Sequence, residues 1–198
     1  MITTTATSTV GSPFTGVTVD LERGKILEFA EATHSTHAAY RDAERPVVPP
    51  TYLCGTDSIA GAHDVPSERD CRFFGAPPRA GDQLTVTVRD GEHDRITEYR
   101  DADGRLIADA WTQGAGGDTA VVGQLANYAT DWLGPESVRR FRTRLVTAVA
   151  ADETLSCSGE VVQEYTADGE ARVDVVLTAT GQGGRVAARA WATFARAA

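Results

Sequence analysis

The sequence contains an internal repeat. The segments Gly104–Trp111 and Gly184–Trp191 agree at five of eight positions, including the tryptophan, and they lie 80 residues apart. This distance exceeds the period of about 20 to 50 residues that is typical of stacked repeat arrays. We therefore expect a duplicated domain, in which each copy contributes one helix and a set of strands.

The apolar pattern around this repeat predicts one helix followed by several strands, twice over. Ile26, Phe29 and Ala30 fall on one face of a first helix, for which Asp20 is the expected N-cap. The second helix is expected at residues 121–133, because a Gly-Pro pair follows it. Strands are predicted at residues 71–74, 84–88, 95–100, 105–111, 138–149, 155–165, 171–180 and 185–194.

These elements define a tail and two units. We place a flexible tail at residues 1–17, the first unit at residues 18–113 and the second at residues 114–198. A curved antiparallel sheet that wraps around one helix leaves an edge strand whose backbone groups are unpaired. Two such sheets joined edge to edge form one continuous sheet. We therefore predict an α+β fold in which two antiparallel sheets, each wrapped around one helix, are joined in this way.

The composition excludes several classes of partner. The net charge is −9 and the pI is about 4.9, which argues against a nucleic-acid partner because phosphate neutralisation needs a basic face. No run approaches the roughly 20 apolar residues of a membrane helix, so we expect no membrane partner. Three cysteines without metal-like or CxxC spacing indicate buried thiols in a reducing cytoplasm.

Four arginines cluster in one predicted strand, at Arg139, Arg140, Arg142 and Arg144. In one interpretation they occupy alternate positions on the solvated face of that strand. In the other they contact the phosphates of coenzyme A or of a carrier-protein arm. The sequence leaves both interpretations open.

Polar and titratable residues gather where the first helix is expected to end. His34 and His37 are three residues apart, so they share a face if the helix continues, and Tyr40 and Asp42 follow. Tyrosine can donate a hydrogen bond, although its ordinary pKa of about 10 makes it a poor base. No third ligand lies at a spacing that suits a metal ion. We expect neither a metal nor a cofactor.

The next segment, residues 46–50, must be extended, because proline lacks the N–H donor and restricts the residue before it. The layout of residues 34–51 resembles the MaoC-like hydratase/dehydratase family, which adds water to acyl thioesters or removes it on a hot-dog fold. Aligned on the Tyr-Arg-Asp triplet, the family's catalytic Asp falls on Ser35 and its catalytic His on Tyr40, so the usual dyad is missing. The Pro-Pro-Thr form of the motif, typical of non-catalytic N-terminal halves, matches Val48–Thr51.

The resemblance implies a double hot-dog fold with an acyl tunnel between the halves. In such enzymes a backbone N–H at the start of a helix acts as the oxyanion donor. The C-terminal half lacks the family's Asp-to-His segment, and Val121–Gly123 replaces the Ala-His-Gly helix start. Gly123 could still offer its N–H. The substrate-binding residues implied are Thr51, Tyr52, Gly123, Gln124 and Asn127.

The sequence favours a lyase- or isomerase-type enzyme that acts on an acyl or polyketide thioester of coenzyme A or a carrier protein. The reaction would be dehydration, hydration, or a related addition, isomerisation or cyclisation at an α,β-unsaturated centre, and the missing dyad argues against ordinary β-hydroxyacyl dehydration. His34 or His37 would be the base and Tyr40 a hydrogen-bond donor, and Asp42 is the fourth residue of this expected catalytic group. The alternatives are a non-catalytic acyl-binding subunit that partners a catalytic chain, and an acyl thioesterase. A homodimer, or a heterodimer with another hot-dog subunit, is expected.

Overall fold

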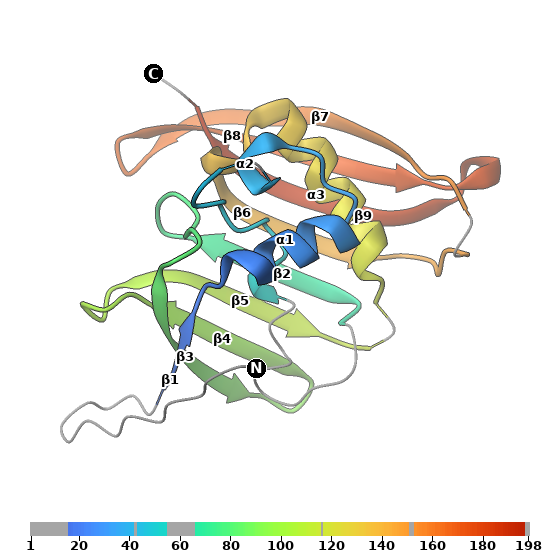
Figure 1. Ribbon diagram of the computed structural model, residues 1–198. Coiled ribbons are helices and arrows are strands. Elements are labelled where there is room, and N and C mark those ends of the chain that lie inside the picture. The colour runs from blue at the N-terminus through green and yellow to red at the C-terminus, as the bar shows by residue number, and fades with distance from the viewer. Residues whose placement is uncertain (1–15, 42, 55–65, 116, 151–152, 197–198) are drawn as a thin grey trace.

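The computed structural model describes residues 16–41, 43–54, 66–115, 117–150 and 153–196. Three α-helices and nine strands form most of this part of the chain (Figure 1). Their bounds are β1 Val17–Asp20, α1 Arg23–Ala32, α2 Ala38–Arg41, β2 Glu68–Phe73, β3 Gln83–Asp90, β4 Asp94–Arg100, β5 Leu106–Gln113, α3 Thr119–Leu133, β6 Val138–Leu145, β7 Ser156–Ala167, β8 Glu170–Thr180 and β9 Val186–Ala195.

All nine strands belong to one sheet in the order β1-β3-β4-β5-β2-β6-β9-β8-β7, and every neighbouring pair is antiparallel. The order is symmetric about the pair β2 and β6. On one side of this seam lie β5, β4 and β3, and on the other side lie β9, β8 and β7. The second half therefore repeats the strand order of the first in reverse across the sheet.

A local two-fold axis passes between Asp70 of β2 and Arg142 of β6, which face each other across the seam. Asp70 pairs on its other side with Trp111, and Arg142 pairs on its other side with Trp191. The two repeated tryptophans thus stand at equivalent distances, in strands, from the seam. The internal sequence repeat corresponds to this two-fold relation in the sheet.

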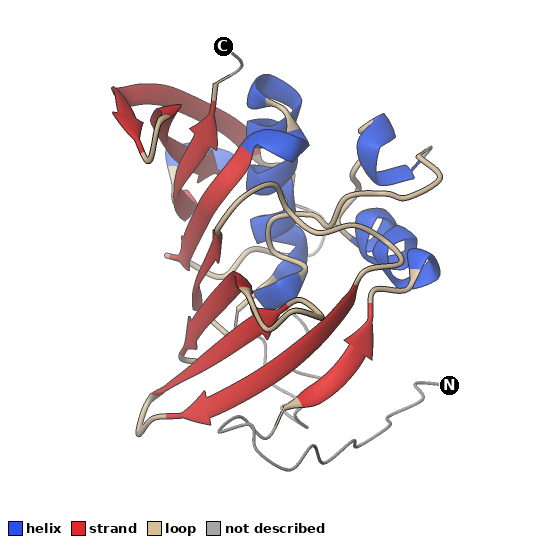
Figure 2. Cartoon of the chain, turned by 90° about the vertical axis from the view of Figure 1, so that its left-hand side faces the viewer, coloured by secondary structure: helices blue, strands red, loops and turns tan. Residues whose placement is uncertain are grey.

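The helices lie together on one face of the sheet, which we call the inner face (Figure 2). Helix α3 packs against β6, β7, β8 and β9. Helix α1 contacts α2, and its Ile26 is fully buried in the main hydrophobic core. The opposite side of the sheet, which we call the outer face, has no helix over it in this view.

Strand β8 illustrates how the sequence divides the two faces. Val173, Val175, Leu177 and Ala179 are all at most 1% exposed and alternate with half-buried residues. Because successive side chains of a strand point to opposite faces, this alternation places the four apolar residues in the core. The same pattern in β6 buries Phe141 on the inner face.

The predicted strands and the second helix are all present, within a few residues of the expected ends. Strand β1 was not predicted, because its four residues lie in a Thr- and Val-rich stretch next to the expected tail. The prediction that Asp20 caps α1 is wrong. Asp20 ends β1, and the N-cap of α1 is Glu22, whose side chain makes no capping hydrogen bond. No described helix combines the length and the hydrophobicity needed to span a bilayer.

Candidate functional site

The first helix ends earlier than a shared face for His34 and His37 requires. Helix α1 stops at Ala32, and the Thr33 hydroxyl donates to Phe29 O at 2.9 Å. His34 follows with φ of +56°, a left-handed conformation in which the helix cannot continue. The two histidines therefore do not lie one turn apart on a helix. The His34 side chain is exposed.

His37 is half-buried and begins the next helix. Its Nδ1 accepts a hydrogen bond from the backbone N–H of Ala39 at 3.1 Å, so the ring caps the first turn of α2. An accepting Nδ1 fixes the neutral tautomer with its hydrogen on Nε2. The ring is also 5.9 Å from that of Tyr40, centroid to centroid. His37 is thus presented as a hydrogen-bond donor through Nε2.

Tyr40 is fully buried, in a small cluster with Ala30 and Val47. Burial raises the pKa of the Tyr40 hydroxyl well above its ordinary value, and the neighbouring Thr130 hydroxyl opposes only part of this rise. The phenol therefore stays protonated and away from solvent in this structure. Asp42, the fourth residue of the predicted catalytic group, lies outside the described residues.

The proline-rich segment, residues 46–50, packs beside α2 and is followed by Thr51 and Tyr52. Val47 N–H donates to Ala39 O at 3.1 Å, and Val48 N–H donates to Pro78 O at 3.0 Å. Thr51 is buried, and its hydroxyl has no hydrogen-bond partner among the described residues. Tyr52 is half-buried, with its ring edge-on to that of Phe29 at 5.3 Å, and burial raises its pKa. The predicted substrate-binding pair thus consists of an unpaired buried hydroxyl and a partly accessible phenol.

The N-terminus of α3 is closed by its own cap. Asp118 Oδ1 accepts from the N–H groups of Ala120 at 2.8 Å and of Val121 at 3.2 Å. Gly123 is the fifth residue of α3, so its N–H points along the helix toward a carbonyl one turn back. Packing explains why this residue is glycine, because a Cβ here would lie 2.5 Å from Thr33 Cβ.

Helix α3 contacts the end of α1 at Thr33, directly before residues 34–51, which we call the motif segment. Asn127 Nδ2 donates to Thr33 O at 2.7 Å, and Gly123 lies directly against the Thr33 side chain. Gln124 is half-buried on the same helix. The structure therefore brings Gly123 and Asn127 to the end of α1, immediately before His34. It holds the two halves together at the place where the site residues were predicted.

Acid–base pairs are missing from this region in the part of the chain that the structure describes. His34 and His37 take part in no ion pair there, and no group of three or more His, Cys, Asp or Glu side chains is arranged for a metal ion. Ser35 and Tyr40, at the positions of the family's catalytic Asp and His, are both buried. The region offers hydroxyls and amides for binding, and one imidazole N–H.

Sequence reasoning missed Arg69 of β2. It is 1% exposed, on the inner face of the seam, in register with Thr112 of β5 and Thr143 of β6, which are also buried. The Thr143 hydroxyl has no hydrogen-bond partner within the described ranges. The signal was present in the alternation of β2, where Arg69 is in phase with the core residues Cys71 and Phe73.

The comparisons with known proteins agree with this geometry. A family model described as the FAS1-like dehydratase domain region matches residues 8–106, which is half of the chain. A comparison with curated protein sequences gives no match. The chain is a hot-dog protein, as its sheet and helices already indicated. It belongs to the FAS1-like dehydratase family, whose model covers half of its residues.

Several solved structures share the fold over nearly their whole length. One described as a MaoC-like dehydratase has a TM-score of 0.69 at 14% identity, covering 89% of this chain and 95% of its own. A MaoC-like dehydratase from Phytophthora capsici has a TM-score of 0.63 at 10% identity, covering 91% and 95%. A Mycobacterium tuberculosis protein described as having a double hotdog fold has a TM-score of 0.61 at 11% identity, covering 90% and 93%. At these identities the likeness establishes the fold, and the resemblance to the MaoC-like family is confirmed.

Proposed function

We propose that the chain acts on an α,β-unsaturated or β-hydroxy acyl thioester, as a hydratase/dehydratase-type hot-dog protein. The proposal is supported by the family match and carried by one observation: Asn127 holds α3 against the end of α1 through its 2.7 Å bond to Thr33 O. This contact joins the two units that we propose at residues 18–113 and 114–198, each a sheet around one helix. The thioester would lie where they meet.

In this proposal His37 polarises the thioester carbonyl. Its Nδ1 is occupied by the Ala39 N–H at 3.1 Å, so Nε2 carries the hydrogen of the neutral ring. A donor that faces developing negative charge on the carbonyl oxygen lowers the barrier to enolate formation. The exposed His34 is then the candidate base within the described residues. Tyr52 and Gln124, both half-buried, would contact the substrate.

The inner face of the seam suits an oxygenated chain. Arg69 is buried and its Nη2 donates to Pro66 O at 3.2 Å, whereas the adjacent Thr143 hydroxyl is buried without a partner in the described structure. Buried polar groups favour ligands that satisfy their hydrogen bonds. We therefore propose a polyketide-like or otherwise oxygen-bearing acyl group in preference to a plain hydrocarbon. The free cysteines fit the cytoplasm, where such thioesters are made.

A turnover assay on the purified chain tests this function. Hydration of an enoyl-coenzyme A and of the same enoyl group on a carrier protein would be followed by product formation, with release of free acid measured in parallel. We expect hydration without free acid, and a loss of at least tenfold in kcat for His37→Ala. His93→Ala is the matched control, because this histidine is exposed in the turn between β3 and β4. Free acid as the main product would instead indicate a thioesterase.

A second candidate function is a non-catalytic acyl-binding subunit. Two observations favour it: the dyad positions hold the buried Ser35 and Tyr40, and Asp118 occupies the first-turn N–H groups of α3 that could receive an oxyanion. In that case a partner hot-dog chain would supply the acid and base. The chain alone would bind an acyl thioester without turnover, and His34→Ala and His37→Ala would leave the turnover of the complex unchanged.

A further inference from the structure

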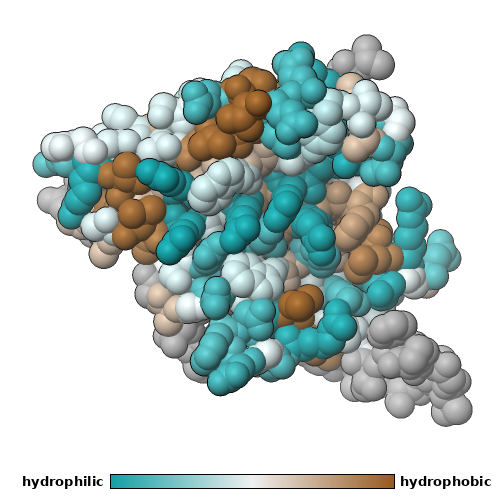
Figure 3. All heavy atoms as spheres, turned by 180° about the vertical axis from the view of Figure 1, so that it is seen from behind, coloured by the Kyte–Doolittle hydropathy of each residue, from teal (hydrophilic) through white to brown (hydrophobic). Residues whose placement is uncertain are grey.

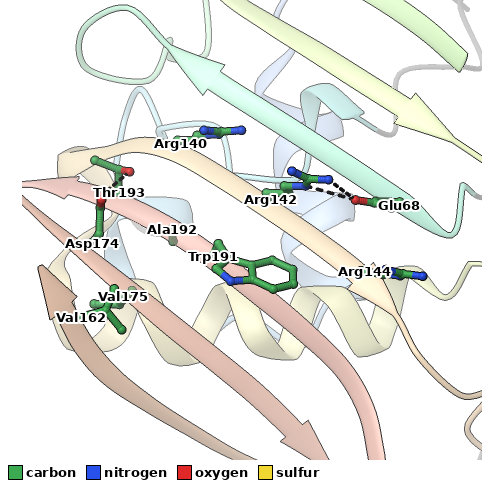
Figure 4. Close-up of a pocket in the computed structure, with 10 residues that line it drawn as sticks. All are labelled: Glu68, Arg140, Arg142, Arg144, Val162, Asp174, Val175, Trp191, Ala192 and Thr193. Atoms are coloured by element: carbon green, nitrogen blue, oxygen red, sulfur yellow. Dashed lines mark hydrogen bonds and ion pairs between the residues drawn. The ribbon is translucent and has the colours of Figure 1, made fainter.

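The outer face of the sheet carries a hollow that the proposed reaction does not use. Figure 3 shows this side of the molecule, with hydrophilic side chains across its middle. The hollow has a volume of about 450 Å³ and extends from the seam over β9 and β8 to β7 (Figure 4). It is lined by Glu68, Arg140, Arg142, Arg144, Val162, Asp174, Val175, Trp191, Ala192 and Thr193.

The two halves differ in charge at equivalent positions of this face. In the first half, Arg72 pairs in register with Asp109, and its Nε donates to Asp109 Oδ1 at 2.8 Å. In the second half the corresponding register pair is Arg144 and Arg189. Neither of these two arginines has a hydrogen bond or ion pair within the described ranges. Two like charges directly opposite on neighbouring strands repel each other unless an anion joins them.

The repeated tryptophans differ in the same sense. Trp111 donates its Nε1–H to Asp94 Oδ2 at 2.8 Å, and the guanidinium of Arg142 lies 5.9 Å from its ring centre. Trp191 makes no such contacts in the described part of the chain and is 41% exposed. Figure 4 shows its ring lying along the sheet beside Arg142. In the first half, Arg72 and the Trp111 indole therefore have partners within the protein. In the second half, the corresponding Arg144 and Trp191 are accessible to a ligand.

The carboxylates at the hollow are already engaged. Glu68 Oε1 accepts from Arg142 Nε at 3.1 Å and from Arg142 Nη2 at 2.5 Å. Asp174 Oδ1 accepts from the Thr193 hydroxyl at 2.7 Å and from the Tyr165 hydroxyl at 3.3 Å. Their negative charge is therefore offset within the protein or directed to neutral donors. Glu68 also lies opposite Arg144 across the seam, but its hydrogen bonds go to Arg142, so Arg144 and Arg189 have no hydrogen-bonded counterion within the described residues.

We propose that this outer-face hollow binds a nucleotide, with its base stacked on Trp191 and its phosphates held by Arg144, which lines the hollow, and by Arg189, which lies opposite Arg144 on β9 and two residues from Trp191. An exposed indole provides a face for a flat ring, and paired guanidiniums match the geometry of phosphate oxygens. The nucleotide can come from two sources, a free purine nucleotide or the adenosine phosphate end of coenzyme A. The site lies on the face opposite the helices and does not depend on the proposed reaction.

Isothermal titration of the full chain with ADP, coenzyme A, adenosine and pyrophosphate tests this site. We expect ADP to bind, and Arg189→Asp to weaken its binding at least tenfold, because this change restores the ion pair that the first half contains. Trp191→Leu should weaken ADP binding by about tenfold, within the range of a stacked base. Adenosine and pyrophosphate should each bind more weakly than ADP.

Matched controls separate the site from general charge effects. Arg105→Asp makes the same charge change at an exposed turn, and Trp132→Leu removes an exposed tryptophan from the helix side. Both should keep ADP binding within twofold. Coenzyme A that binds at least tenfold more tightly than ADP identifies coenzyme A as the source, and any smaller preference identifies a free nucleotide. The proposal is overturned if ADP does not bind, if Arg189→Asp and Trp191→Leu leave binding unchanged, or if pyrophosphate binds as well as ADP.

Discussion

Gly123 of α3 packs directly against Thr33 at the end of α1. The importance of this contact for stability can be tested by adding one methyl group at Gly123. A Cβ at Gly123 would lie 2.5 Å from Thr33 Cβ, 2.6 Å from Thr33 Cγ2 and 3.3 Å from Thr33 Cα. The first two distances are far below van der Waals contact, and the atoms belong to a side chain fixed by its bond to Phe29 O at 2.9 Å. Gly123→Ala must therefore move α3 or the end of α1.

Two opposing terms set the size of the effect. Overpacking of a core contact costs about 2 kcal/mol, within a range of roughly 1 to 3. Alanine in place of glycine inside a helix contributes about 1 kcal/mol in the other direction. We expect Gly123→Ala to lower the free energy of unfolding by about 1 kcal/mol. In a Thr33→Gly background, where the clashing atoms are gone, the same change should raise it by about 1 kcal/mol.

The measurement is a double-mutant cycle by urea unfolding of the four proteins, followed by circular dichroism. The expected coupling between the two sites is about 2 kcal/mol. Gly24→Ala is the control, because it adds a methyl group to α1 where no atom lies within 4 Å, and it should not destabilise the protein. A coupling below about 0.5 kcal/mol would mean that the two side chains do not share a contact, and the packing argument would be refuted.

Three further perturbations follow from individual contacts. Tyr40→Phe removes a buried hydroxyl and should change stability by less than about 1 kcal/mol without changing turnover; a hundredfold loss of kcat would place Tyr40 against the substrate. Asp118→Ala removes the α3 cap and should cost about 1 kcal/mol in urea unfolding, whereas no change would show that the cap does not stabilise the helix. Arg139 lowers the pKa of Glu170 below its ordinary 4.5, so the stabilisation is present above that value and is lost as the pH falls through the lower folded-state pKa. Glu170→Gln should therefore flatten the acid side of the stability profile, and an unchanged profile would contradict this.

The arrangement of the sheet could be predicted from the sequence to a large extent. The repeat of Gly104–Trp111 at an offset of 80 residues predicted two related halves, and the register around Asp70 and Arg142 relates the two tryptophans by a local two-fold axis. Apolar patterns located eight of the nine described strands, because a half-buried strand alternates to keep one face in the core. Strand β1 escaped prediction because four residues carry too little periodicity, and its place was decided by pairing with β3.

The candidate site was harder to predict, because it depends on where α1 ends. Glycine or asparagine commonly marks the left-handed position after a helix, but here His34 adopts φ of +56°. Histidine is enriched among the non-glycine residues that adopt a positive φ, but it is a weaker signal for a helix end than glycine or asparagine. The stop is closed locally, because His34 N–H donates to Glu31 O at 3.0 Å and Ser35 N–H donates to Ala30 O at 2.7 Å, as in a Schellman motif. Contacts of Thr33 with α3, which is about 90 residues away in sequence, hold this end in place.

The two faces of the sheet suggest how duplication has been used in this chain. On the inner face, Ser35 and Tyr40, which the sequence alignment places at the positions of the family's acid and base, are both buried. On the outer face the two halves differ, because Arg189 stands where the first half has Asp109, and an internal ion pair becomes two accessible cations. An exposed guanidinium that makes no ion pair within the described residues is available to an anion, with which it forms charge-assisted hydrogen bonds. We therefore expect the outer face of the second half, and not that of the first, to bind an anionic ligand.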